Sequence, residues 1–478
     1  MVLLRDGFTL AYLGIGTLHA YIQAGVGWAV FNLTQPPPTP ILVIQERYTA
    51  EGIGANIGIP TSVPAYYLWG RIAVAMMGIA TIWLTYLIGR EIDSAEVGLL
   101  GALFLAASPL HAEHSQNLVR DMPGLLFLLL AFYFLLIAYR QEKWRWVVLA
   151  GISAGLALLA KSNNVILAAP LVLTLGLSLR RAAGRRSLRE ILGAGGVRAL
   201  AVAAGGLVLA LAVASFPGYL RMNYNFVFGH TFGQGGNTPF WVIDYFLRDP
   251  WRFVFLLSLP GMGLAAVALR ERGWLLLSIP VPYLLTLSFF TTRYLHWLVP
   301  ALPFLGILAG LFLVHGGRWL GQRLARWRLP WSWLVAIGAL GITLTSFRLI
   351  ATQDYWLSQK DVRVTASEWL QANIPDGAKV MIEQYGPYLP PETRQVVYVT
   401  SAAEEDLGTY RAEGVGYLVV NQSQYRLTQA EAANLQGDPA VKEYLARYQT
   451  IAGLPLVQEF VGPVMRYPGS WIRVYRID

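Results

Sequence analysis

Residues 108–139 read SPLHAEHSQNLVRDMPGLLFLLLAFYFLLIAY, and this stretch contains both features on which the fold of the chain depends. The second part, Met122–Tyr139, is apolar and carries no charged side chain. The first part, Ser108–Asp121, gathers two histidines, a glutamate, an arginine and an aspartate. Because a helix needs about 20 mostly apolar residues to cross the hydrocarbon core of a bilayer, the stretch predicts a polar loop that leads into a membrane span.

The composition of the whole chain indicates that this pattern is repeated. Of the 478 residues, 55% are hydrophobic and 14% are charged, and the mean hydropathy is +0.46. An average soluble domain carries about 25% charged residues, so ordinary soluble folds are excluded. We expect about eleven spans, near Phe8–Phe31, Tyr66–Ile88, Val97–Leu110, Met122–Tyr139, Trp146–Ala160, Val165–Leu179, Ala199–Phe216, Phe253–Leu269, Trp274–Phe290, Leu295–Val314 and Trp331–Phe347.

The last part of the chain has a different pattern, in which short strands and helices alternate. Strands are predicted at Lys379–Glu383, Gln395–Thr400, Val415–Asn421, Leu456–Val461 and Trp471–Arg476, and helices at Thr365–Asn373, Glu404–Glu413 and Thr428–Tyr448. This alternation is typical of a small α/β domain. The chain therefore divides into a membrane domain, residues 1–350, and a soluble domain, residues 351–478. The soluble part has neither a Gly-rich phosphate loop nor a histidine cluster.

The distribution of basic residues predicts the direction of the spans. With a cytoplasmic N-terminus, the inner loops hold 16 Lys and Arg residues in 54 positions, and the outer loops hold 7 in 89. Since basic residues accumulate in cytoplasmic loops, this orientation is favoured. An odd number of spans then makes the C-terminal domain extracytoplasmic. We expect the first apolar run, which follows the single Arg5 and has no clear cleavage site, to remain as a span.

The formal net charge of +9 is divided unevenly between the two parts. Residues 351–478 carry 11 basic and 15 acidic residues, whereas residues 1–350 carry 26 and 13. The Arg-rich inner stretches Arg180–Arg198 and Arg318–Arg328 are expected to face anionic lipid headgroups. Membrane topology explains these charges, so a nucleic-acid partner is not favoured. The absence of cysteine excludes disulfides and thiolate metal sites and leaves the redox compartment open.

Ionisable side chains are rare at membrane depth, where they mark functional sites by default. Here they are nearly absent from the spans and gather in the predicted outer loops. They are Glu46, Arg47, Glu51, His111, Glu113, His114, Arg120, Asp121, Lys161, Asp244, Asp249 and Arg293. Since five loops on one side contribute, we expect a cavity at the outer membrane surface.

Three stretches, taken in order, resemble one family of membrane enzymes. The first is Ser108–Pro123, in which Ser-Pro is followed by a helix with serine and by Asp-x-Pro. The second is Thr292–Pro303, which opens with Thr-Arg-Tyr and contains Pro300 and Pro303 at a spacing of three. The third lies in the tail, at Ala366–Ala378 and Gly414–Val420. Together they resemble the lipid-linked-sugar glycosyltransferases with the C-type (GT-C) fold, which include protein O-mannosyltransferases and the aminoarabinose transferase of lipid A.

The resemblance implies a polytopic α-helical membrane protein of the bacterial plasma membrane, with a small extracytoplasmic α/β domain. It implies a glycosyltransferase that moves a sugar from a polyprenyl phosphate to an acceptor hydroxyl at the outer face. The implied partners are the polyprenyl-phosphate-linked sugar, membrane lipids and an acceptor that is a protein, a lipid or a glycan. A place in a larger membrane complex is also open. No cofactor is required, and a divalent cation is an alternative.

Carried over from the family motifs, Asp121 would be an acid of the site and Arg293 would hold the donor phosphate, with Arg120 or Lys161 as further cations. A carboxylate can take the proton of an acceptor hydroxyl, and a cation can stabilise a leaving phosphate. A structural alternative is that Arg120 and Asp121 cap the helix that starts at Met122. Arg293 would then be an interfacial anchor beside aromatic side chains.

Three further observations leave alternatives open. Tyr294 and His230 are candidate contacts of the substrate, and packing against neighbours is the alternative for His230. Two histidines at a three-residue spacing share one face of a helix, as a metal site would require. The ligands of such a site would be His111, Glu113, His114 and Asp121.

The first outer loop departs from the family pattern. Members usually carry Asp-Glu followed shortly by Tyr, and that Asp is the expected catalytic base. Here the nearest match is Gln45–Tyr48, with Gln45 in the place of the Asp, so that Glu46 or Glu51 would have to act as the base. A second hypothesis is therefore a catalytically silent structural subunit of a membrane complex. A transporter is the third, and it is disfavoured because no charge pairs are predicted near the midplane.

Overall fold

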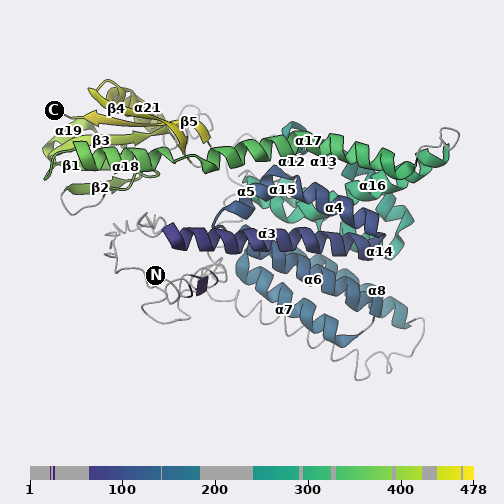
Figure 1. The fold of residues 1–478 in the computed structure, drawn as a ribbon. Coiled ribbons are helices and arrows are strands. Elements are labelled where there is room, and N and C mark those ends of the chain that lie inside the picture. Colours follow the sequence, from purple (N-terminus) through teal and green to yellow (C-terminus); the bar gives the residue numbers. More distant parts are fainter. Residues whose placement is uncertain are drawn as a thin grey trace. The chain divides into compact units, whose positions relative to one another are not determined.

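The computed structural model describes residues 64–141, 143–183, 241–289, 294–323, 330–389, 394–422, 439–464 and 467–477, together with positions 22, 25, 26 and 29. From residue 64 onward these residues form two compact units. Unit 1 extends from Pro64 to Ile350, and unit 2 begins at Ala351. Unit 1 is helical, whereas unit 2 is built on a five-stranded sheet (Figure 1).

Unit 1 consists mainly of apolar helices. They are α3 (Pro64–Ile92), α4 (Ala95–Ala106), α5 (Pro109–Gln116), α6 (Asp121–Gln141), α7 (Trp144–Ala160), η2 (Ser162–Leu167), α8 (Ala168–Ala183), α12 (Trp241–Arg248), α13 (Arg252–Ala268), α14 (Arg270–Leu277), α15 (Pro280–Ser288), η3 (Leu295–Ala301), α16 (Leu302–Arg323) and α17 (Trp331–Ser358), whose residues from Ala351 onward belong to unit 2. The multi-pass helical class predicted from the sequence is thereby confirmed. The predicted spans near Phe8–Phe31 and Ala199–Phe216 lie outside the described residues.

Within the described residues, four helical segments are long and apolar enough to cross a membrane. They are Leu68–Ile92, Asp121–Gln141, Leu295–Arg323 and Trp331–Asn373. A bent pair, α4 with α5, would make a fifth if it is one broken span. The described ranges cover only part of the predicted spans, so the total of about eleven stays a prediction.

The predicted run Val97–Leu110 is broken before its end. Helix α4 ends at Ala106, and α5 begins at Pro109 at an angle of 65°. The Ser108 side chain caps α5 by accepting from the backbone N–H of His111 at 3.4 Å. Proline suits the first position of a helix because its missing N–H would have no partner there. The break therefore starts a new, polar helix at Ser-Pro.

Helix α16 is the buried centre of unit 1. In the segment Leu295–Arg323, which contains α16, 89% of the most apolar part is buried. In the segment Trp331–Asn373, which contains α17, the corresponding share is 22%. Helix α13 packs against α16 with its backbone very close, because a Cβ added at Gly261 would lie 2.1 Å from the carbonyl oxygen of Leu308. Small residues at such contacts let membrane helices approach closely and gain dispersion energy.

We predict that Gly261→Ala destabilises unit 1, because the new methyl group has no room and the two helices must separate. Overpacking of this kind costs about 1–3 kcal/mol. Gly263→Ala is the matched control, since a Cβ at Gly263 meets no atom within 4 Å. Thermal unfolding of the detergent-purified chain measures the effect. Equal melting temperatures for the two variants would contradict the packing described here.

Unit 2 is an α/β fold with one mixed sheet. Its elements are α18 (Val362–Asn373), β1 (Lys379–Glu383), β2 (Gln395–Val399), α19 (Leu407–Ala412), β3 (Val415–Asn421), α21 (Pro439–Ala452), β4 (Leu456–Val464) and β5 (Tyr467–Arg476). The strand order is β2-β1-β3-β5-β4. Strands β2, β1 and β3 are parallel, and β5 is antiparallel to both β3 and β4.

The predicted strands of the tail are confirmed, and β1 and β3 have the predicted bounds. Gly377 and Gly414, which precede these two strands, have φ of +78° and +73°, a region that glycine enters without steric cost. The predicted helix Thr428–Tyr448 is described from Pro439 onward as α21. Residues 423–438 lie outside the described part of the chain.

A buried carboxylate ties the elements of unit 2 together. Glu383, the last residue of β1, is 1% exposed. Its Oε1 accepts from the Ala402 N–H at 2.9 Å and from the Tyr448 hydroxyl at 2.5 Å. Its Oε2 accepts from the Asn421 N–H at 2.8 Å, and Ser401 Oγ lies 2.6 Å from the Tyr448 hydroxyl. Burial is the main cause that raises the pKa of Glu383 to about 7.

This pKa predicts that unit 2 becomes less stable as pH rises toward 7. Between the ordinary pKa of 4.5 and about 7, folded Glu383 holds a proton that the unfolded chain has released. The resulting stabilisation, about 3 kcal/mol, is complete below pH 4.5 and is lost as pH rises through 7. Hydrogen-exchange protection of the β3 amides, corrected for intrinsic rates, should therefore be higher at pH 5.5 than at pH 8.

Two variants separate this effect from general charge effects. Glu383→Gln removes the titrating group and should flatten the dependence between pH 4.5 and 7. Glu368 on α18, whose side chain is 60% exposed, is the control, and Glu368→Gln should keep the full dependence. A steep dependence in Glu383→Gln would show that another group is responsible.

Candidate active site

The predicted polar site residues of unit 1 that the structure describes lie where several helices begin or end. Helix α5 and the first turn of α6 follow one another, α7 ends at Ala160, and η2 and η3 are short 3-10 turns. Pro109 starts α5, Asp121 starts α6, and Lys161 follows the end of α7. The breaks bring side chains from four different segments to one place.

Asp121 and Lys161 form a buried ion pair at this place. Lys161 Nζ donates to Asp121 Oδ1 and, at 3.2 Å, to the backbone carbonyl of His296. The side chains are only 4% and 5% exposed. Asp121 lies in the first turn of α6, where the helix dipole favours a negative charge. Lys161 lies between α7 and η2 in an extended conformation.

Two histidines complete the described part of the cluster. His114 Nδ1 lies 3.4 Å from Asp121 Oδ2, on the side of the carboxylate opposite to Lys161. The ring of His296 lies 6.2 Å from the ring of His114 and 5.4 Å from that of Tyr294. Asp121 thus has a cation on one oxygen and a titratable imidazole beside the other. An arrangement of this kind can hold a carboxylate ionised and can relay a proton.

His111 is buried but faces away from the carboxylate. Its Nε2 lies 2.8 Å from Thr81 Oγ1, whose own proton goes to the carbonyl of Gly78 at 2.6 Å. Since a hydroxyl has one proton to donate, His111 must carry its proton on Nε2. The two histidines of α5 therefore have different partners. Within the described ranges, no three His, Asp or Glu side chains are grouped to hold a metal.

The other predicted site residues divide into two groups. Arg120 is exposed and lies near enough to Lys161 and His296 to interact with them electrostatically. Tyr294 is 43% exposed, and its ring packs edge-on against Trp297 at 5.0 Å. The remaining predictions, Glu46, His230 and Arg293, lie outside the described residues, as does Glu51.

The structural alternative for Asp121 requires a correction. The helix begins at Asp121 and not at Met122, so Asp121 is a residue of the first turn and not a cap preceding it. Its carboxylate is also directed to Lys161 and His114, which lie on other segments. A local capping role therefore does not account for its contacts.

Sequence reasoning missed two residues of this cluster. His296 comes three positions after Arg293 in the Arg-Tyr motif, and its backbone carbonyl contacts Lys161. Asn164 comes three positions after Lys161 and bonds to α6 and α7. No local pattern marked these two residues, because His296 contributes through its backbone carbonyl and Lys161 has an extended backbone, so that its spacing to Asn164 is not that of a helical turn.

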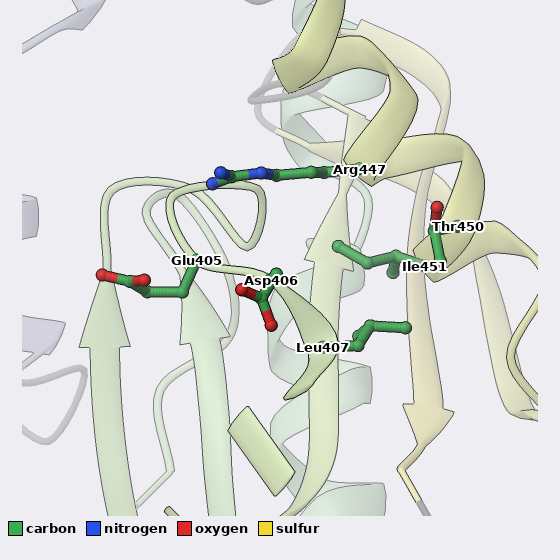
Figure 2. Close-up of a pocket in the computed structure, with 6 residues that line it drawn as sticks. All are labelled: Glu405, Asp406, Leu407, Arg447, Thr450 and Ile451. Atoms are coloured by element: carbon green, nitrogen blue, oxygen red, sulfur yellow. The ribbon is translucent and has the colours of Figure 1, made fainter. Parts of the chain in front are cut away.

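Unit 2 has a pocket of about 70 Å³ beside α21, lined by Glu405, Asp406, Leu407, Arg447, Thr450 and Ile451 (Figure 2). Arg447 extends across the loop and donates to the carbonyl of Glu404 at 2.6 Å. Asp406 accepts from the Thr409 N–H as the cap of α19. Sites for small molecules usually measure about 300–1,000 Å³, so this pocket is too small for a sugar phosphate. The contacts of Arg447 and Asp406 instead fix the loop before α19.

Residues 68–216 match the family model of the dolichyl-phosphate-mannose-protein mannosyltransferases. This range includes α5, Asp121 and Lys161. The resemblance found in the sequence, to the lipid-linked-sugar glycosyltransferases with the GT-C fold, is thereby confirmed over this range. No curated protein matches this chain.

Solved structures are similar to this chain in fold. The archaeal oligosaccharyltransferase AglB from Archaeoglobus fulgidus, in complex with an inhibitory peptide and a dolichol-phosphate, has a TM-score of 0.52 and 13% identity over 90% of this chain and 64% of AglB. The Archaeoglobus fulgidus oligosaccharyltransferase with Zn and sulfate has a TM-score of 0.51 and 15% identity over 95% and 64%. ArnT from Cupriavidus metallidurans with undecaprenyl phosphate has a TM-score of 0.47 and 15% identity over 85% and 84%. The chain therefore spans about 64% of the length of AglB.

We predict that Asp121 and Lys161 are strongly coupled in stability. Asp121→Asn or Lys161→Met leaves one buried charge without its partner, which costs about 3–5 kcal/mol, whereas the double variant leaves neither charge. The double variant should therefore be much more stable than the sum of the single effects predicts. Thermal unfolding of the four proteins gives the coupling.

An exposed pair in the same unit provides the comparison. Asp244 and Arg248 lie 2.8 Å apart and are 55% and 80% exposed, so their coupling should be close to zero. Additive losses for Asp121 and Lys161, as for this exposed pair, would contradict a buried and desolvated ion pair.

Proposed function

We propose that the chain transfers a sugar from a polyprenyl-phosphate donor to an acceptor hydroxyl at the outer face of the membrane. The observation that carries the proposal is the buried Asp121–Lys161 pair at one end of a bundle of apolar helices. The match of residues 68–216 supports a lipid-linked donor, because the matching family model is named for dolichyl-phosphate-mannose.

The chemistry assigns a role to each described side chain. Asp121 receives the proton of the acceptor hydroxyl as the new glycosidic bond forms, and its ionised state makes it available for that proton. Lys161 keeps Asp121 ionised before the donor binds, and its positive charge stabilises the leaving phosphate. His114 accepts or returns the proton beside the second oxygen of Asp121.

Two exposed residues within the described ranges, and several residues outside them, complete the proposal. Arg293, carried over from the family motif, contacts the donor phosphate, and Arg120 adds positive charge at the exposed rim. Glu46 or Glu51 supplies a second carboxylate in the first outer loop. Tyr294 lies against the sugar, since its exposed ring is adjacent to His296.

The donor and acceptor classes follow by analogy. AglB was solved with a dolichol-phosphate and an inhibitory peptide, and the lipid supports a polyprenyl-phosphate donor here. The proposed acceptor is a hydroxyl-bearing protein, lipid or glycan. The basic inner loops support a plasma-membrane protein with a cytoplasmic N-terminus and an extracytoplasmic unit 2. A structural role in a membrane complex is the second candidate, and Gln45 is the residue that favours it.

Turnover by purified protein tests the proposal. The chain is incubated with radiolabelled polyprenyl-phosphate sugars and with membrane extracts as the source of acceptor. Asp121→Asn should lower kcat by about 100-fold or more, because loss of a positioned proton acceptor costs 10²–10⁴ in rate. The exposed Asp244 is the matched control, and Asp244→Asn should keep nearly the wild-type rate.

The outcomes separate the enzyme from the silent subunit. Full turnover by Asp121→Asn would remove Asp121 from the mechanism. A wild-type protein without turnover, which Gln45→Asp does not activate, would support the structural role instead. Mass spectrometry of copurified lipid identifies the donor class in either case.

A further inference from the structure

Asn164 is a buried polar residue that the proposed chemistry does not use. It lies in η2, three positions after Lys161, and is 0% exposed. Its Nδ2 donates to the carbonyl of Ala157 in the last turn of α7 at 2.8 Å and to the carbonyl of Gly124 in the first turn of α6 at 3.0 Å. One carboxamide group therefore links the end of α7 to the start of α6 through two hydrogen bonds.

The orientation of this amide is fixed by its partners. If oxygen and nitrogen were exchanged, Oδ1 would face two carbonyl oxygens, which is repulsive. In the observed orientation Oδ1 is buried and accepts no hydrogen bond from the described residues. The two N–H donors are thus the part of Asn164 that stabilises the local structure.

The backbone around Asn164 makes a sharp change of direction. Lys161 has φ of −156° and ψ of 125°, so α7 stops there and η2 begins. The Lys161 N–H donates to Ala157, and the Asn164 N–H donates to the carbonyl of Lys161 at 3.1 Å. Asn164 closes this turn onto the end of α7 and at the same time fastens it to α6. Lys161 and Asp121 lie on the two segments that Asn164 connects.

Gly124 gives independent support for a close approach. A Cβ added at Gly124 would lie 3.1 Å from Asn164 Nδ2 and 3.2 Å from Lys161 Cβ. Both distances are shorter than ordinary van der Waals contact, so a larger residue would push the turn away from α6. The contact surface of α6 is therefore shaped for both Asn164 and Lys161.

We propose that Asn164 is a positioning residue that sets the separation of Asp121 and Lys161. A lysine ammonium on a flexible four-carbon stem does not fix its own distance from a carboxylate. Catalytic groups must be held within about 0.5 Å of the productive geometry by their surroundings. Asn164 supplies that constraint by holding the backbone of one charged residue against the helix of the other. The catalytic part of this inference rests on the proposed function.

The first test measures coupling in stability and requires no activity. The Asp121→Asn and Lys161→Met double-mutant cycle is repeated by thermal unfolding in an Asn164→Leu background. Leucine keeps most of the volume, and the Ala157 carbonyl keeps its bond from the Lys161 N–H. The coupling should fall to less than half of its wild-type value. An unchanged coupling would overturn the proposal.

The second test separates positioning from a merely structural role. With labelled donor, Asn164→Leu should lower kcat by about 10- to 100-fold and leave KM for the donor within about twofold, because the charged groups remain but their geometry is relaxed. Asn163 is the matched control, since its Nδ2 donates at 3.3 Å to the Tyr283 hydroxyl and not to α6 or α7. Asn163→Leu should change kcat by less than about threefold.

A third variant keeps the proposal testable if Asn164→Leu does not fold. Gly124→Ala widens the same separation from the opposite side while Asn164 is retained, and it should lower both the coupling and kcat. Wild-type values in Gly124→Ala would overturn the proposal. If the wild-type chain shows no turnover, the proposed function fails, and the stability cycle alone decides whether Asn164 positions the pair.

Discussion

The burial of the Lys161 ammonium against Asp121 is the constraint on which the polar end of unit 1 depends. A charge removed from water is tolerated only when a partner and further hydrogen bonds replace its hydration. Here those bonds come from a carboxylate on α6 and from the His296 carbonyl on η3. The pair therefore requires two distant segments to meet the loop between α7 and η2. The break before Ser108 then brings His114 to the same carboxylate.

Much of the fold could be predicted from local patterns. The apolar runs gave the membrane helices because length and lack of charge are sufficient for a span. The bounds of β1 and β3 were predicted correctly because Gly377 and Gly414 precede them and short runs of consecutive apolar residues mark their lengths. The break at Ser108 was hidden because Pro109 and Leu110 continue an apolar run. Its signal was the Ser-Pro pair, which is a helix start.

The site could be predicted only in part, since local patterns do not determine which loops meet. Asp121 was selected from its motif, and Arg120 and Lys161 were alternative further cations of the site. The structure pairs Asp121 with Lys161, forty positions away, and leaves Arg120 exposed. His296 accepts a hydrogen bond through its backbone carbonyl, and because every residue has such a carbonyl, the residue type could not predict this contact. Asn164 resembles an ordinary loop asparagine until its two helical partners are known.

The two ends of the helices differ in a way that argues for function. At the far end, Glu91 pairs with Arg140 and Glu96 with Arg318, and these pairs are partly exposed and contribute little to stability. The Asp121–Lys161 pair is almost completely buried. Replacing a buried ion pair by apolar residues of similar size is often neutral or stabilising, so stability alone does not explain charges at this position. A site of the proposed kind, which takes a proton and stabilises a leaving phosphate, would require both charges. The proposed function would therefore account for a pair that the membrane environment otherwise disfavours.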